Sequence, residues 1–262
     1  MKKKNPRPDE RRSEKITSIG RAAARLFNEK GFLETSMNDI SDAARLSKGG
    51  IYHYFSSKND ILYSILMNYL DLIMEGLEEK LKVRDDSSEK IRFFIARHIE
   101  LYRTNISEAK TLLHEAHFLP ARYFKTIAEK ERKYYQILAS LLSEFFNGQV
   151  PKERLTTITF SLLGMCNWIY SWYDPQGPVP PEELSEIIYT IFSGGAKGYR
   201  WGAQVAVPFL RTATVKKIGL SIKAVGFPID LLPVQHKNIP DLVTRMEDIP
   251  FVCFSVSSHS TM

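Results

Sequence analysis

The chain has 262 residues, a formal net charge of +6 and a hydrophobic fraction of 44%. This length allows a small binding domain beside a second domain with a sizeable core. The two cysteines, Cys166 and Cys253, exclude a disulfide framework and are typical of a reducing cytoplasm. No apolar segment follows the basic N-terminus, and the longest apolar-rich run, residues 160–173, is too short and too polar to span a bilayer. We therefore expect a cytoplasmic protein without a membrane partner.

The excess positive charge lies in the first part of the chain. Residues 1–58 contain 13 Lys or Arg and 7 Asp or Glu, whereas residues 59–262 contain 23 of each sign. A local excess of this kind is typical of a segment that binds a polyanion. Residues 1–12 are predicted to form a basic arm. The arm is either a solvated tail or a flexible segment that contacts phosphates or the minor groove.

Residues 13–58 are predicted to form three helices. The first is amphipathic, with apolar residues at helical spacing: Ile16, Ile19, Ala23, Leu26 and Phe27. The second is two turns long and begins with a capping box formed by Ser36 and Asp39. The third begins at Lys48, behind Ser47 as its N-cap. Two very short helices joined by a tight turn are typical of a helix-turn-helix that reads DNA.

The third helix has an unusual composition. Gly49 and Gly50 are poor helix formers, and their lack of a side chain is explained if another backbone must come very close. Ile51 and Phe55 lie four residues apart and face inward. At least two of the three aromatic side chains at positions 52–54 must therefore project outward, where they can contact a partner.

Residues 13–63 resemble the TetR family of bacterial transcriptional regulators. The likeness is carried by Ser47-Lys48-Gly49-Gly50-Ile51-Tyr52-His53-Tyr54-Phe55, followed by Lys58, and by the apolar pattern of the first helix. The resemblance implies an all-α fold: an N-terminal helix-turn-helix three-helix DNA-binding domain, here residues 13–58, plus a six-helix ligand-binding and dimerisation domain, here residues 59–202. The family often has Gly at the position of Arg45. If Arg45 takes a positive φ, that conformation costs roughly 1 kcal/mol, which a phosphate contact could offset.

The family resemblance also implies which residues contact a double-stranded DNA operator. The major groove would be contacted by Lys48, Gly49, Tyr52 and His53. Phosphates would be held by Ser36, Tyr54 and Lys58. The predicted DNA-binding set is completed at the turn and the cap by Arg45, Ser47 and Gly50. Because a helix-turn-helix of this class reads a two-fold site as a dimer, we expect a homodimer on an inverted repeat.

The rest of the chain to about residue 200 is almost entirely helical in pattern. Apolar spacing predicts six helices, over residues 60–82, 89–104, 107–119, 122–146, 152–173 and 181–194. The last of them begins with a proline at its first position and two glutamates in its first turn. Residues 203–262 lose this periodicity, and we predict an extension to which we assign no role.

The last two predicted helices carry broad apolar faces. In the family, the corresponding pair forms a four-helix bundle with the partner subunit, and the alternative is that these faces pack inside one subunit. The predicted dimerisation residues are Leu155, Leu162, Met165, Leu184, Ile188 and Ile191.

An aromatic segment, Asn167-Trp168-Ile169-Tyr170-Ser171-Trp172-Tyr173-Asp174-Pro175, is similar to a segment of acyl-CoA-responsive members of the family. Trp168 and Trp172 are therefore candidate ligand-binding residues, although they could equally be bulky core or interface residues. The candidate polar groups of the pocket are His98, Arg103 and His117. His114 and His117 alone make an incomplete metal site, so we predict no metal and no cofactor.

Taken together, the patterns predict a ligand-responsive transcriptional repressor that a small hydrophobic effector, for example an acyl-CoA, releases from its operator. Two alternatives stay open: a regulator of drug efflux that responds to an aromatic or cationic compound, and a ligand-independent DNA-binding protein. An activator is also compatible with the sequence. A nucleophile elbow, a P-loop and a dinucleotide fingerprint are all missing from the sequence, which argues against an enzyme.

Overall fold

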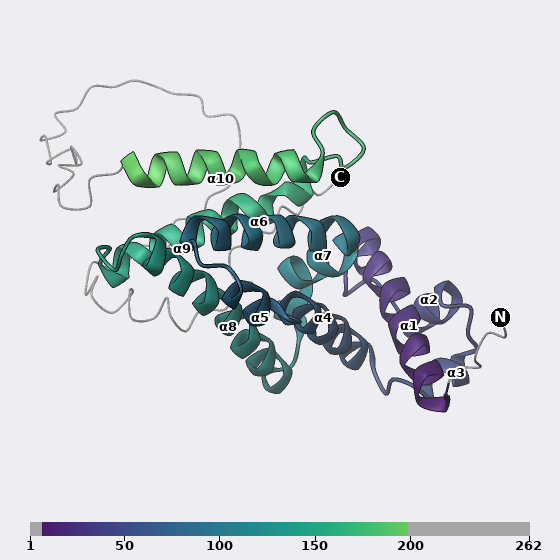
Figure 1. Cartoon of the computed structure of the whole chain (residues 1–262). Helices are drawn as coiled ribbons and strands as arrows, with labels where there is room; N and C mark the ends of the chain where they lie inside the picture. The colour runs from purple at the N-terminus through teal and green to yellow at the C-terminus, as the bar shows by residue number, and fades with distance from the viewer. Residues whose placement is uncertain (1–6, 199–262) are drawn as a thin grey trace, which may run out of the picture.

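The computed structural model describes residues 7–198. The predicted extension 203–262, Cys253 and the first six residues of the basic arm lie outside the described residues. Within residues 7–198 all regular secondary structure is helical, which confirms the all-α prediction (Figure 1). Its α-helices are α1 (Pro8–Lys30), α2 (Met37–Ala43), α3 (Lys48–Tyr52), α4 (Lys58–Met74), α5 (Leu77–Lys82), α6 (Ser87–Thr104), α7 (Ile106–Glu115), α8 (Ala121–Phe145), α9 (Lys152–Asn167) and α10 (Pro181–Gly198).

The helix-turn-helix lies at one end of the molecule, where α1 packs against α2 and α4 (Figure 1). Its core is formed by the apolar residues that the periodicity predicts to face inward, and Ile19, Phe27 and Ile51 are at most 1% exposed. The same hydrophobic core continues along α4 into the second domain. Because α1 also packs against α7, the short helices α2 and α3 are attached to the larger body on two sides.

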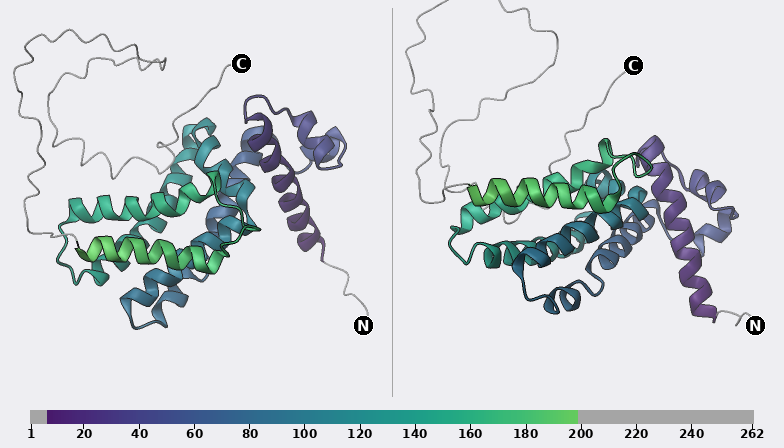
Figure 2. Two further views of the ribbon diagram at one scale, coloured as in Figure 1. Left: turned by 90° about the horizontal axis from the view of Figure 1, so that it is seen from above. Right: turned by 45° about the horizontal axis from the view of Figure 1, so that its top comes forward.

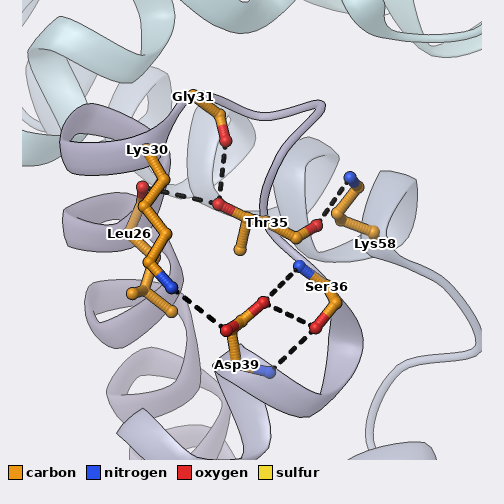
Figure 3. A network of polar contacts seen from close by, with 7 residues as sticks. All are labelled: Leu26, Lys30, Gly31, Thr35, Ser36, Asp39 and Lys58. Carbon is orange, nitrogen blue, oxygen red and sulfur yellow. Dashed lines mark hydrogen bonds and ion pairs between the residues drawn. The ribbon is translucent and has the colours of Figure 1, made fainter.

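Both predicted N-caps of the short helices are present. The Ser36 hydroxyl accepts a hydrogen bond from the Asp39 amide at 3.1 Å, and the Asp39 carboxylate accepts one from the Ser36 amide at 2.8 Å (Figure 3). Lys30 pairs with the same carboxylate, which ties α1 to the start of α2. At α3, the Ser47 hydroxyl accepts a hydrogen bond from the Gly50 amide at 3.0 Å. These bonds satisfy amides that very short helices would otherwise leave without partners.

The turn between α2 and α3 contains a residue in the left-handed region. Arg45 has a φ of 53°, so the strained conformation considered for this family position, where glycine is frequent, is present. The turn is held by the Ser41 hydroxyl, which donates to the Leu46 carbonyl at 2.7 Å, and by the Arg45 amide, which donates to the Asp42 carbonyl at 3.1 Å. Local hydrogen bonds therefore maintain a backbone conformation that an L-residue disfavours.

Three predicted helices differ from the observed ones. The helix over 60–82 is interrupted at Gly76, whose φ is 61°, and becomes α4 and α5. Apolar periodicity continues across the break, but the Arg97 guanidinium donates to the Leu72 carbonyl at 3.0 Å and to the Glu75 carbonyl at 2.7 Å. This contact from α6 terminates α4. The helices over 107–119 and 152–173 each end in a short 3₁₀ segment, η1 (Ala116–Phe118) and η2 (Trp168–Ser171).

The second domain is a helical bundle around α6 and α8. α8 packs against α4, α6 and α9, and α10 packs chiefly against α6. Figure 2 shows α9 and α10 running side by side along one face of the molecule. None of the helices in the described part of the chain has the length and apolar character needed to cross a membrane.

Arg45 provides a test of the strained turn. Arg45→Gly should raise the free energy of unfolding by about 1 kcal/mol, because glycine adopts a positive φ without the Cβ clash. Urea unfolding of the purified protein measures this change. Arg45→Ala is the control, since it removes the charge and keeps the strain. An equal gain from both substitutions would attribute the effect to charge and contradict the strain interpretation.

Candidate DNA-reading surface and effector core

The predicted reading residues share the solvent-facing side of α3. Lys48, Gly49 and His53 are exposed, and Tyr52 is 46% exposed. Ile51 is fully buried and anchors the helix to the core from its other side. An exposed row of a cation, a glycine and two aromatic or imidazole groups on a short helix can enter a groove and meet both phosphates and base edges.

The structure explains why position 50 is a glycine but gives no such reason for Gly49. A Cβ added to Gly50 would lie 3.2 Å from the Ser47 hydroxyl, so a side chain there would press on the N-cap. A Cβ added to Gly49 would meet nothing within 4 Å. The fold therefore explains Gly50 and leaves Gly49 unexplained, which fits the prediction that a partner approaches closely at Gly49.

The remaining predicted contacts surround α3. Ser36, Arg45 and Ser47 are all exposed, although the hydroxyls of Ser36 and Ser47 are already engaged in their caps. Tyr54 is half-buried, and the Arg12 guanidinium of α1 lies 5.5 Å above the centre of its ring. Residues 8–12, predicted as part of the arm, are the start of α1 instead, and Arg12 lies beside Tyr54, which is two residues beyond the end of α3.

Lys58 does not have the free ammonium that its predicted phosphate contact requires. Its Nζ donates to the Thr35 carbonyl at 2.7 Å (Figure 3) and to the carbonyls of Phe32 and Leu33 at 2.5 and 3.1 Å. It also lies 4.4 Å from the centre of the Phe32 ring. Partial burial lowers its pKa, against the opposing effect of nearby carboxylates. Since an ammonium has three protons, all of them are used within the protein. Lys58 therefore fastens the loop after α1 to the start of α4.

The second domain contacts the start of α4 through α8. The Tyr123 hydroxyl donates to the Asp60 carboxylate at 2.8 Å, and the Tyr123 ring stacks on Tyr63 with centres 4.4 Å apart. The other Asp60 oxygen accepts a hydrogen bond from the Ser57 hydroxyl at 2.9 Å. The Ser57–Asp60 capping box is visible in the sequence, but its partner Tyr123 carries no sequence signal. This contact connects α8 to the helix that directly follows the reading helix.

The interior of the second domain contains a bonded polar cluster. His98 from α6 forms hydrogen bonds with the Tyr134 hydroxyl at 2.9 Å and the Asn167 side-chain oxygen at 3.0 Å. Tyr102 donates to the same Asn167 oxygen at 3.3 Å. Because that oxygen only accepts, His98 Nε2 carries the proton and Nδ1 accepts from Tyr134. Burial lowers the pKa of His98 to about 4, more than the Asn167 bond raises it, so the imidazole is neutral at pH 7.

The other predicted ligand-binding residues do not line this interior. Arg103 is exposed and pairs with Glu100 at 2.6 Å, and His117 is exposed against the Phe118 ring. Trp168 and Trp172 are 62% and 60% exposed. The physical reason is that α9 ends at Asn167, so the aromatic segment leaves the helical register and turns these indoles outward. Of the five predicted ligand-binding residues, only His98 lies in the interior of the second domain. The sequence analysis missed Tyr102, Tyr134 and Asn167 because their hydrogen-bond partners are distant in sequence.

The predicted dimerisation residues divide into two groups. Leu162, Leu184 and Ile188 are at most 5% exposed and pack within the subunit, so they are corrected to core residues. Leu155 and Met165 are half-buried, and Ile191 is 60% exposed. The outward face of α9, the adjoining η2 and α10 instead contains Thr157, Ser161, Gly164, Trp168, Ile187 and Ile191. On α10 the predicted set therefore includes residues of the inward stripe as well as one of the outward stripe, and the dimer interface itself stays a prediction.

Within residues 7–198, no group of three or more His, Cys, Asp or Glu side chains could hold a metal ion.

Two family models match the chain. Residues 84–196 match the one described as tetracyclin repressor-like, C-terminal domain, and residues 19–65 match bacterial regulatory proteins, tetR family.

Similar proteins agree with both matches. The HTH-type transcriptional repressor KstR2 of Mycolicibacterium smegmatis is 22% identical over 176 residues, which cover 66% of this chain and 86% of that protein. The fatty acid metabolism regulator protein of Bacillus subtilis is 28% identical over 155 residues, 59% of this chain and 76% of that protein. The crystal structure of AibR in complex with isovaleryl coenzyme A and operator DNA has a TM-score of 0.61 and 28% identity, over 68% of this chain and 97% of that chain. The helix-turn-helix, the helical second domain and these matches together establish that the chain belongs to the TetR family of bacterial transcriptional regulators and is a DNA-binding protein of the repressor type.

Proposed function

We propose that the protein is a homodimeric cytoplasmic repressor that an acyl-CoA releases from an inverted-repeat operator. The observation that carries the DNA-binding part is the exposed row on α3, with Gly49 open to close approach. The effector part is supported by relatives, since AibR was crystallised with isovaleryl coenzyme A and operator DNA and another relative is a fatty acid metabolism regulator.

In the proposed complex, α3 enters the major groove with Lys48, Tyr52 and His53 toward the bases. Arg45, Arg12 and Tyr54 are positioned around it to hold phosphates, which set the register of the helix on the duplex. Arg12 replaces Lys58 in this role, because the ammonium of Lys58 is used within the domain. The strain at Arg45 would then be offset when its guanidinium meets a phosphate.

Dimerisation in the proposal uses the outward face of α9 and α10. Exposed Trp168, Ile187 and Ile191 supply apolar area, and Gly164 on α9 has no neighbour within 4 Å of an added Cβ. A small residue beside large exposed ones allows two helices to approach closely. Two subunits joined there would present two α3 helices related by a two-fold axis.

Release follows from a population shift. An effector that binds among α6, α8 and α9 must prefer one arrangement of these helices over the other. Movement of α8 would be transmitted to α4 through the hydrogen bond between Tyr123 and Asp60. Because α4 directly follows α3, the separation of the two reading helices would change and the operator would no longer fit.

The DNA-binding residues can be tested on a site selected from random DNA. Arg12→Gln should reduce the slope of log affinity against log salt by about 0.9, the value for one phosphate, because Arg12 holds a phosphate in place of Lys58 in the proposed complex. Lys58→Met should leave the slope unchanged and lower the free energy of unfolding by about 1–3 kcal/mol, because three carbonyls lose their donor. A slope change for Lys58→Met alone would reverse the two assignments.

The dimer face predicts a second pair of variants. Ile191→Glu should give a monomer in sedimentation velocity, with little affinity for the selected site, because a charge would be buried between subunits. Val83→Glu is the control, since Val83 is 79% exposed at the end of α5, away from this face. A native monomer that binds one half-site tightly would contradict the proposal.

The effector is tested by titration calorimetry with acyl-CoAs of increasing chain length, beside the matched free acids and free coenzyme A. Affinity should rise by up to about 0.8 kcal/mol per CH₂ until the site is full, and the same thioesters should release the selected DNA site. Equal binding of the free acids would indicate another lipid sensor. Release by a cationic drug, with no thioester bound, would favour regulation of drug efflux.

A further inference from the structure

Glu131 is a buried acid that the fold does not use. It lies in the middle of α8, is 7% exposed, and neither of its carboxyl oxygens has a hydrogen-bond partner among the described residues. Burying such a group without a partner costs several kcal/mol in an apolar environment. Since no described residue gives this group a partner, a role outside folding is its simplest explanation.

The position of Glu131 is determined by helical register. Ile127, Tyr134 and Leu138 lie four residues before and three and seven residues after it, and all are buried on the same stripe of α8. The carboxyl group is therefore inside because its helix face is inside. The neighbouring cations do not neutralise it, since Lys130 pairs with Asp71 and Lys133 pairs with Glu78 at 3.0 Å.

Other buried polar side chains of this domain are accounted for by contacts within it. His98 is bonded to Tyr134 and Asn167, and the hydroxyls of Thr111 and Thr159 donate to carbonyls one turn earlier in their own helices. Arg97 has a buried Nε without a partner, but its terminal nitrogen terminates α4. Glu131 differs because neither of its carboxyl oxygens has a hydrogen-bond partner among the described residues.

The helix face that carries Glu131 packs among aromatic and aliphatic side chains. Tyr134, one turn along α8, stacks on Phe94 of α6 with ring centres 4.9 Å apart, and α8 also packs against α4 and α9. Aromatic and aliphatic walls with one convergent polar group are typical of small-molecule sites. This is the same group of helices among which the effector is proposed to bind.

The protonation state restricts the chemistry of the ligand group. Burial raises the pKa of Glu131 to about 8, so the carboxylic acid is neutral at pH 7. A neutral acid can donate one hydrogen bond and accept others. It therefore suits a carbonyl or hydroxyl oxygen. An ammonium group would require a second buried charge and further acceptors, while the nearby hydroxyl and amide groups are already bonded to one another.

We propose that Glu131 is the specificity-determining residue of the effector site and selects an acyl or ring group that carries a hydroxyl or carbonyl oxygen over the plain hydrocarbon. This inference rests on the proposed acyl-CoA response and narrows its ligand class. Without that oxygen, the buried acid stays unpaired in the complex, which disfavours the hydrocarbon analogue. The oxygenated ligand should therefore bind roughly ten to a hundred times more tightly than its matched hydrocarbon.

The test uses the full chain and CoA thioesters of one chain length: the saturated acyl chain, chains with a hydroxyl or keto group at successive carbons, and one with a terminal amine. Titration calorimetry should show that the wild type prefers at least one oxygenated thioester by about tenfold or more. Glu131→Gln, which keeps a donor and an acceptor, should retain the preference. Glu131→Leu should abolish it and bind the saturated thioester at least as tightly as the wild type.

Glu129→Gln is the matched control, because Glu129 is exposed on the same helix and should leave all affinities unchanged. Thermal unfolding accompanies each variant, and Glu131→Leu should melt no lower than the wild type. Equal wild-type affinities for saturated and oxygenated thioesters would overturn the inference without any variant, as would a preference that survives in Glu131→Leu or a preference for the amine. Failure of every thioester to bind would instead refute the proposed acyl-CoA response itself.

Discussion

The arrangement of the helix-turn-helix depends on the Lys58 ammonium, which donates hydrogen bonds to three carbonyls of the loop between α1 and α2. Within that loop the Thr35 hydroxyl donates to the Gly31 carbonyl at 2.8 Å, and the ammonium adds charge-assisted hydrogen bonds from α4. The consequence is that α2 and α3 are oriented with respect to α4. Since Asp60 in the same first turn of α4 also binds Tyr123 of α8, the position of the reading helix is connected to the second domain through the first turn of one helix.

Polar groups in the second domain are used in two different ways. His98, Tyr102, Tyr134 and Asn167 satisfy one another, so they hold α6, α8 and α9 together at little desolvation cost. Glu131, on the same stripe as Tyr134, is satisfied by no described residue. Under the proposed effector response, the bonded cluster would hold the helices in place, and the unbonded acid would be left to bind the ligand.

Much of the fold was predictable because its signals are local. The caps at Ser36 and Ser47, the inward residues of α3 and the positive φ of Arg45 each depend on a few adjacent residues, and all are observed. The break at Gly76 was missed because Arg97, which terminates α4, comes from another helix. The site was less predictable, since aromatic content alone cannot tell an inward indole from the outward ones of Trp168 and Trp172.

By itself, then, the sequence determined the helix-turn-helix, the all-helical second domain and the family, because capping, periodicity and a spaced motif act over one or two turns of chain. Only the tertiary structure decided that Lys58 serves the fold, that Leu162 and Ile188 are core while Ile191 faces outward, and that Glu131 has no partner within residues 7–198. These outcomes depend on which neighbour each helix face meets, and that is settled by packing between segments distant in the chain.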